Sequence, residues 1–233
     1  MEIKQLKKFL ETYHVDFDDK KVAQFSLYSE LLEEWNQKMN LTALAKEDFV
    51  EKHFLDSLLL VKTHGFKSQS IMDLGSGAGF PGIPLKIVFP ELNLFLVEPT
   101  QKRCLFLQEL VEKLDLKNVT IVNKRAEDLE RSMRESFDIV VARAVASLPI
   151  LLELAIPYLK IDGVFIALKG PSGLEELEKS KKALKTLQVK HIKTDTHQLE
   201  SDSAIRNNIV FLKLKETNDK FPRTYAQIKR KPL

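Results

Sequence analysis

The chain has 233 residues, of which 44% are hydrophobic and 30% are charged, and its formal net charge is +3. This composition is ordinary for a globular protein with a sizeable core. It excludes a membrane-spanning chain, because no apolar run is long enough to cross a bilayer. A single cysteine, Cys104, excludes an internal disulfide, and the first residues lack the apolar core of a secretion signal. We therefore expect a cytoplasmic protein, and a monomer.

Basic side chains concentrate at the end of the chain. Segment 213–233 carries a charge of +5, so the remaining residues sum to −2. A basic end on a near-neutral body is typical of an arm that contacts nucleic-acid phosphates, and a solvated tail without a ligand fits the charge equally well. The bases of this segment are Lys213, Lys215, Lys220, Arg223, Lys229, Arg230 and Lys231.

The first 65 residues show a helical pattern. Apolar and aromatic residues recur at three- and four-residue spacing from Phe25 to Trp35 and again from His53 to Val61. Between these stretches, Asn40-Leu41-Thr42 predicts a turn or a helix cap.

From Ser70 onward, short β-rich runs alternate with helical stretches, which predicts a mostly parallel sheet covered on both faces. We therefore expect an α/β protein with an α-helical segment (1–65), a Rossmann-like domain (66–215) and a basic C-terminal arm (216–233). Ligands should bind at the carboxyl ends of the strands. The predicted strands are 71–74, 92–97, 119–122, 137–142, 164–168, 189–192 and 209–214, with helices over 101–114 and 174–187.

A glycine turn follows the first predicted strand. Gly75, Gly77 and Gly79 alternate before a helix expected to begin at Gly82 or Ile83, so the backbone can approach a ligand and present free amides to it. The spacing differs from the G-x-G-x-x-G of dinucleotide sites, and Asp73 places a carboxylate nearby, which disfavours a pyrophosphate and favours a cationic methionine moiety. The turn therefore favours S-adenosylmethionine, with purely structural glycines as the alternative.

Other polar residues follow the later strands. Glu98 ends the second strand, 23 residues after Gly75, where an acid accepts hydrogen bonds from ribose hydroxyls. After the third strand, Ala126 and Glu127 are placed to contact an adenine edge, although a helix N-cap cluster explains the acids nearly as well. Arg143 ends the fourth strand, over the expected reaction zone.

Several kinds of site lack support in the sequence. The Asn/Asp-Pro-Pro-aromatic motif of adenine-N6 methyltransferases is absent, and Cys104, on a predicted helix, is expected to be buried and unreactive. None of the five histidines shows the spacing of metal ligands, so we predict no metal.

These motifs together resemble the glucose-inhibited division protein B family, bacterial 16S rRNA guanine-N7 methyltransferases also called ribosomal small-subunit methyltransferase G. The resemblance covers the chain from about Phe25 to its end, and the stretch Asp73–Pro84 is the most specific part. The matching motifs are Trp35-Asn36, Asn40-Leu41-Thr42, His53-Phe54-Leu55-Asp56-Ser57, Asp73 through Pro84, Arg125-Ala126-Glu127, Val141 through Ala146, and Ala167-Leu168-Lys169-Gly170.

The resemblance implies a class I S-adenosylmethionine-dependent methyltransferase sheet. It also implies cofactor contacts from Gly75, Phe80, Ala126, Glu127 and Arg143. The substrate would be a guanine in the helix 18 loop of 16S rRNA, free or in a small ribosomal subunit. Two places depart from the family pattern: Glu98-Pro99-Thr100 replaces Asp-Ser, and Ala226 and Ile228 replace Gly and Pro in the arm.

Guanine N7 carries a lone pair and no hydrogen, so its methylation needs no base to remove a proton. We therefore predict no dedicated acid–base residue. We expect catalysis to come from alignment of the reactants and from the electrostatic field at the methyl group. His53 and Asp56 either line the site or cap one another. A nicotinamide-dependent oxidoreductase and an RNA-binding assembly factor with a vestigial pocket are the competing interpretations. RNA phosphates are expected to bind Lys169, Arg223, Lys229, Arg230 and Lys231.

Overall fold

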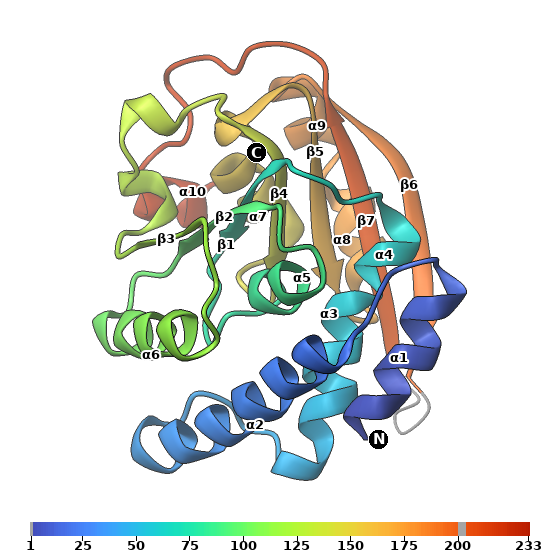
Figure 1. The fold of residues 1–233 in the computed structure, drawn as a ribbon. Helices are drawn as coiled ribbons and strands as arrows, with labels where there is room; N and C mark the ends of the chain where they lie inside the picture. The colour runs from blue at the N-terminus through green and yellow to red at the C-terminus, as the bar shows by residue number, and fades with distance from the viewer. Residues whose placement is uncertain (1, 200–203) are drawn as a thin grey trace.

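The computed structural model describes residues 2–199 and 204–233, and within them a seven-stranded sheet forms the centre of the fold (Figure 1). The strand order is β3-β2-β1-β4-β5-β7-β6. Neighbours from β3 to β5 are parallel, whereas β7 runs antiparallel to both β5 and β6. The strands are β1 (Ser70–Leu74), β2 (Asn93–Val97), β3 (Val119–Val122), β4 (Phe137–Arg143), β5 (Leu159–Lys169), β6 (Val189–Gln198) and β7 (Ile205–Lys213).

The strands β1, β4 and β7 are mostly buried on both faces, with successive side chains pointing to opposite sides of the sheet. In β4, Ile139 and Val141 enter one core, and Val140 and Ala142 enter the other. This explains why the strands read as continuous apolar runs, and it confirms the predicted doubly covered α/β architecture. The first core includes residues of α1 (Ile3–Thr12), α2 (Asp19–Met39), α5 (Gly82–Val88) and α6 (Gln101–Lys113); the second includes residues of α7 (Leu148–Ala155), α9 (Lys181–Thr186) and α10 (Tyr225–Arg230).

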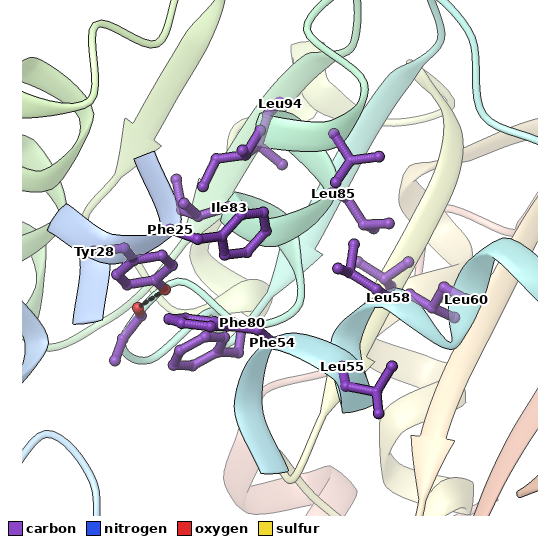
Figure 2. Close-up of a cluster of buried hydrophobic side chains, with 14 of the residues drawn as sticks. Phe25, Tyr28, Phe54, Leu55, Leu58, Leu60, Phe80, Ile83, Leu85 and Leu94 are labelled. Carbon is purple, nitrogen blue, oxygen red and sulfur yellow. Dashed lines mark hydrogen bonds between the residues drawn. The ribbon is translucent and has the colours of Figure 1, made fainter. Parts of the chain in front are cut away.

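The N-terminal helices share the first core with the sheet. Helix α2 lies against α5 and α6, and Figure 2 shows its residues Phe25 and Tyr28 packed beside Phe54 and Phe80. The Tyr28 hydroxyl donates a 2.5 Å hydrogen bond to the carbonyl of Ala78, inside the glycine turn. The helical segment therefore supports the turn directly, and the buried cluster continues across the predicted boundary at residue 65.

The predicted single helix over 174–187 is wrong. It consists of α8 (Gly173–Lys179) and α9, which are separated at Ser180. The Ser180 hydroxyl is bonded back to the carbonyl of Glu176, four residues earlier, an interaction that commonly bends helices. Helix α7 was not predicted, because its mostly apolar sequence has no polar face to reveal a helical period.

Candidate active site

Two cavities lie at the carboxyl ends of the central strands, where the chain order reverses between β1 and β4. The glycine-turn cavity, of about 260 Å³, is lined by residues including Gly75, Glu98, Ala126, Glu127, Leu154 and Tyr225. The arginine cavity, of about 360 Å³, is lined by residues including Lys52, His53, Asp56, Arg143, Lys169 and Arg206. Ala144 lines both cavities.

The predicted glycine turn adopts backbone angles that favour glycine. Gly75, Gly77 and Gly79 have φ values of 72°, 57° and 95°. A Cβ on Gly75 would lie 2.6 Å from Cγ2 of Val145, and one on Gly79 would lie 2.8 Å from the Tyr28 hydroxyl. The turn therefore leaves no room for side chains on Gly75 and Gly79.

Asp73 does not line the glycine-turn cavity, so its contact with a cofactor stays a prediction. Its carboxylate is fully buried, and Oδ2 accepts a 2.7 Å hydrogen bond from the amide of Gly82, the first residue of α5. Burial raises the pKa of Asp73 to about 7. Asp73 Oδ1 and the nearby Ser76 Oγ are buried without a hydrogen-bond partner among the described residues. Such orphaned atoms are rare in native structures, and neither residue lines one of the two cavities.

Glu98 lines the glycine-turn cavity, although it is only 2% exposed. Its Oε2 accepts from the amide of Gly77 at 3.0 Å, and its Oε1 accepts from the amide of Thr100 at 2.8 Å. A carboxylate offers about four lone-pair sites. Glu98 therefore ties the turn to β2 and keeps acceptor capacity for a ligand.

The far side of this cavity combines predicted and unpredicted residues. Ala126 and Glu127 belong to a 3₁₀ turn (Ala126–Asp128) and line the cavity as the sequence suggested. Leu154 of α7 and Tyr225 of α10 also line it, and sequence analysis missed both. Tyr225 lies in the basic C-terminal segment, whose charge was its only predicted feature, and no motif around Tyr225 indicates a cavity residue.

Arg143 organises the border of the arginine cavity. It donates to Asp56 Oδ2 and to His53 Nδ1, both at 3.0 Å, and its guanidinium lies 4.9 Å from the ring centre of Phe80. Because arginine only donates, His53 Nδ1 accepts, and the Nε2 proton faces the hydroxyl of Thr42 at 2.8 Å. Burial and the nearby Arg143 lower the pKa of His53 to about 3, so the ring is neutral at physiological pH.

Phe80 forms the floor of this network. Its ring stacks on His53 with centroids 4.3 Å apart and on Tyr28 at 5.3 Å, and it lines neither cavity. Its predicted contact with a cofactor stays a prediction. In the structure the Phe80 ring contacts both His53 and the guanidinium of Arg143.

His53 lies in a π-helix, Phe49–Leu55, a rare conformation that is frequent at functional sites. The carbonyl of Lys52 in this helix accepts a 3.3 Å hydrogen bond from Arg143. Asp56 follows directly, and its Oδ1 lies 3.4 Å from Arg206 Nε. Asp56 therefore bridges two arginines, and both His53 and Asp56 line the arginine cavity. Their role in the active site stays a prediction.

The predicted RNA-binding bases fall into two groups. Lys169 pairs with Glu176 at 2.7 Å, and Arg223 pairs with the fully buried Glu153 at 2.6 Å, so both have carboxylate partners in the protein. The bases of the arm that are exposed in α10 and just beyond it are Lys229, Arg230 and Lys231. Their contact with RNA stays a prediction.

Cys104 adds no exposed thiol to the site. It is 1% exposed, its thiol donates to the Glu98 carbonyl at 3.2 Å, and burial raises its pKa, as expected for an unreactive cysteine. Among residues 2–199 and 204–233, no group of three or more histidine, cysteine or acidic side chains is arranged for a metal ion. No helix in this part of the chain is long and apolar enough to span a bilayer.

The sequence profile of GidB, described as rRNA small subunit methyltransferase G, matches residues 21–205. The chain belongs to this family. The ribosomal RNA small subunit methyltransferase G of Acetivibrio thermocellus is 46% identical and covers 95% of this chain and 92% of its own length. That of Geobacillus kaustophilus is 42% identical over the full length of both proteins. Family membership confirms the resemblance and identifies the chain as an enzyme.

Solved structures share the fold at low identity. A SAM-dependent methyltransferase from Aquifex aeolicus has a TM-score of 0.54 and 16% identity, and covers 71% of this chain and 93% of its own. TYW2 from M. jannaschii, solved in complex with AdoMet, has a TM-score of 0.51 and 17% identity, and covers 63% of this chain and 70% of its own. The expected Rossmann-like class I methyltransferase sheet is therefore confirmed.

Proposed function

We propose that this enzyme transfers a methyl group from S-adenosylmethionine to N7 of a guanine in the helix 18 loop of 16S rRNA. One observation carries the proposal: Ala144, which directly follows β4, lines both the glycine-turn cavity and the arginine cavity. A donor in the first cavity and a nucleotide in the second would face each other across a small side chain. The relatives named rRNA small subunit methyltransferase G support the substrate class.

The residues of the glycine-turn cavity fit S-adenosylmethionine, which supplies an electrophilic methyl group when bound. Glu98 offers acceptor sites for ribose hydroxyls, and Gly75 of the turn lines the same cavity. Asp73 Oδ1 at the end of β1 and Ser76 Oγ in the turn are unpaired among the described residues, but neither residue lines this cavity. Ala126, Glu127 and Leu154 line the same cavity, and α7 packs against the 3₁₀ turn that carries the first two.

The arginine cavity fits a nucleotide. Its lining includes four cations, Lys52, Arg143, Lys169 and Arg206, and two carboxylates, Asp56 and Glu176. Cations in excess suit a phosphodiester. His53 is neutral and already engaged at both ring nitrogens, so it has no role as a proton relay at neutral pH. This agrees with a reaction in which guanine N7 has no proton to lose.

The test is to incubate 16S rRNA and isolated small subunits with the protein and methyl-labelled S-adenosylmethionine. Borohydride reduction followed by aniline cleaves RNA at 7-methylguanine. The expected result is incorporation of the methyl label into the RNA and one cleavage site, in the helix 18 loop. Gly75→Val, whose branched side chain would strike Val145, serves as the inactive control. Lys117→Gln, an exposed residue that precedes the amino end of β3, serves as the active control.

Two outcomes would favour the competing interpretations. Thermal stabilisation by NAD and none by S-adenosylhomocysteine would indicate an oxidoreductase. Tight rRNA binding without label in either substrate would indicate an assembly factor. Labelling at another base would keep the methyltransferase and reject the guanine-N7 assignment.

A further inference from the structure

Helix α10 has one face in the protein and one in solvent. Ile228 is fully buried in the core shared with α7, and Tyr225 lines the glycine-turn cavity, as does Leu154 of α7, the helix against which α10 packs. Lys229 and Arg230 are exposed. The arm is therefore docked on the domain, and it contributes an aromatic side chain to a cavity built mostly from strand ends.

One arginine holds both ends of this helix. The backbone amide and Nε of Arg223 donate to Glu153 Oε1 at 3.0 and 2.8 Å, and its Nη2 donates to Oε2 at 2.6 Å. The same Nη2 donates to the carbonyl of Lys231 at 3.1 Å, just past the last residue of α10. Glu153 is fully buried, so this carboxylate has few ways to compensate for losing its partner.

The residue that binds Arg223 and a residue that lines the glycine-turn cavity are neighbours in sequence. Glu153 and Leu154 are consecutive in α7, so one residue holds the arm and the next lines the cavity. Helix α7 also packs against the 3₁₀ turn that carries Ala126 and Glu127. Tyr225 therefore stands on the side of the cavity where the sequence predicted the adenine contacts.

We propose that Tyr225 contacts the purine of the cofactor, and that Arg223, through Glu153, is the positioning residue that holds it there. The inference rests on the proposed function, because it requires an adenosine ligand in this cavity. An aromatic ring suits a purine, since every base offers a flat face for stacking. The alternative role for Tyr225 is core filling, because the side chain also packs against the second core.

The binding of S-adenosylhomocysteine and of 5′-methylthioadenosine, measured by titration calorimetry, separates these roles. Tyr225→Ala should weaken both ligands at least fivefold and by the same factor, because both carry adenine. Tyr225→Phe should bind within twofold of wild type, because it keeps the ring. Lys215→Gln, an exposed base outside α10, is the control that should change nothing.

Arg223→Gln tests the positioning role in a double-mutant cycle. It should weaken S-adenosylhomocysteine in the wild-type background and have no further effect in the Tyr225→Ala background, because Arg223 acts through the tyrosine. By reciprocity, the ligand should slow amide hydrogen exchange in residues 223–231. Equal affinities of wild type and Tyr225→Ala would overturn the inference and leave the proposed function intact. Failure of wild type to bind either ligand would overturn the proposed function itself.

Discussion

Single backbone conformations shape the site. Gly75 and Gly77 have positive φ values. Ala144, which lines both cavities, also has a positive φ, of 57°. A non-glycine residue with positive φ is uncommon and persists where the surrounding structure enforces it. Here the turn after β1 and the turn after β4 both contain residues with positive φ, close to where donor and acceptor are proposed to meet.

A glycine series separates strain from steric conflict. Gly65→Ala meets no neighbour and no unusual φ, Gly77→Ala meets only a positive φ, and Gly75→Ala meets a positive φ and Val145. We expect losses of unfolding free energy near zero, about 1 kcal/mol, and about 2 kcal/mol or more, respectively. Chemical denaturation checks the order, and equal losses at positions 75 and 77 would show that Val145 yields freely.

Two buried groups give opposite pH dependences of stability. The pKa of His53 falls from 6.5 to about 3 in the folded state. As pH falls from about 6.5 toward 3, only the unfolded chain takes up the proton, so the folded state loses stability. The pKa of Asp73 rises from 3.8 to about 7, so the folded state gains stability as pH falls through that window. Each changes stability by at most about 1.4 kcal/mol per pH unit.

Variants uncover each of these contributions. Relative to wild type, Asp73→Asn should lose stability steadily from pH 6.5 to 4, because it lacks the stability that wild type gains when Asp73 is protonated in the folded state. His53→Gln should gain stability relative to wild type over the same range. The free energy of unfolding in urea, taken as a difference from wild type at each pH, removes the titration of shared groups. Parallel pH profiles for all three proteins would contradict the assignment.

At the scale of elements, helices position the site from outside the sheet. Tyr28 of α2 donates to the glycine turn, the π-helix brings His53 under Arg143, and α7 holds the arm through Glu153. None of these interactions lies within one βα unit. The N-terminal helices and the C-terminal arm therefore act as parts of the active-site frame.

The pair Glu153–Arg223 should show an asymmetric response to mutation. Arg223→Ala leaves a fully buried carboxylate without a partner and should cost about 3–5 kcal/mol. Glu153→Ala leaves an arginine that is 24% exposed and can turn to water, so it should cost less. The double variant should be no less stable than Arg223→Ala alone. Thermal and urea unfolding measure these differences, and additive losses would argue against a direct pair.

At the scale of the whole molecule, some basic side chains of the C-terminal segment form ion pairs within the protein and others are exposed to solvent. Lys213 is fully buried and pairs with Glu135, and Arg223 pairs with Glu153, so part of the predicted basic tail is internal. Lys229, Arg230 and Lys231 remain exposed at the end of the arm. The effective basic surface is therefore smaller than the sequence count suggests, and it lies on the same helix as Tyr225.

Salt dependence tests this surface. Neutralising Lys229, Arg230 and Lys231 together should weaken rRNA binding and flatten the plot of log affinity against log salt concentration, by roughly 0.7–0.9 for each phosphate that the arm no longer neutralises. Lys117→Gln, which removes an exposed base before the amino end of β3, is the matched control and should keep the wild-type slope. An unchanged slope in the triple variant would exclude the arm as a binding site for phosphates.

The local features of the site could be read from residues close together in the chain. The apolar runs predicted the strands, and the alternating glycines after β1 predicted the turn whose φ values are now seen. Glu98, Ala126 and Glu127 line one cavity, because the ends of parallel strands meet at one edge of a sheet. The family followed from the same short motifs.

Interactions between distant segments required the tertiary structure. The burial of Asp73 against Gly82, the pairing of Arg223 with Glu153, and Tyr225 in the cavity wall leave no periodicity or motif in the sequence. Local patterns specify which elements form, because propensity and hydrophobic period act over a few residues. Which partner a buried charge finds is decided only when the core excludes water and each polar group must be paired within the protein.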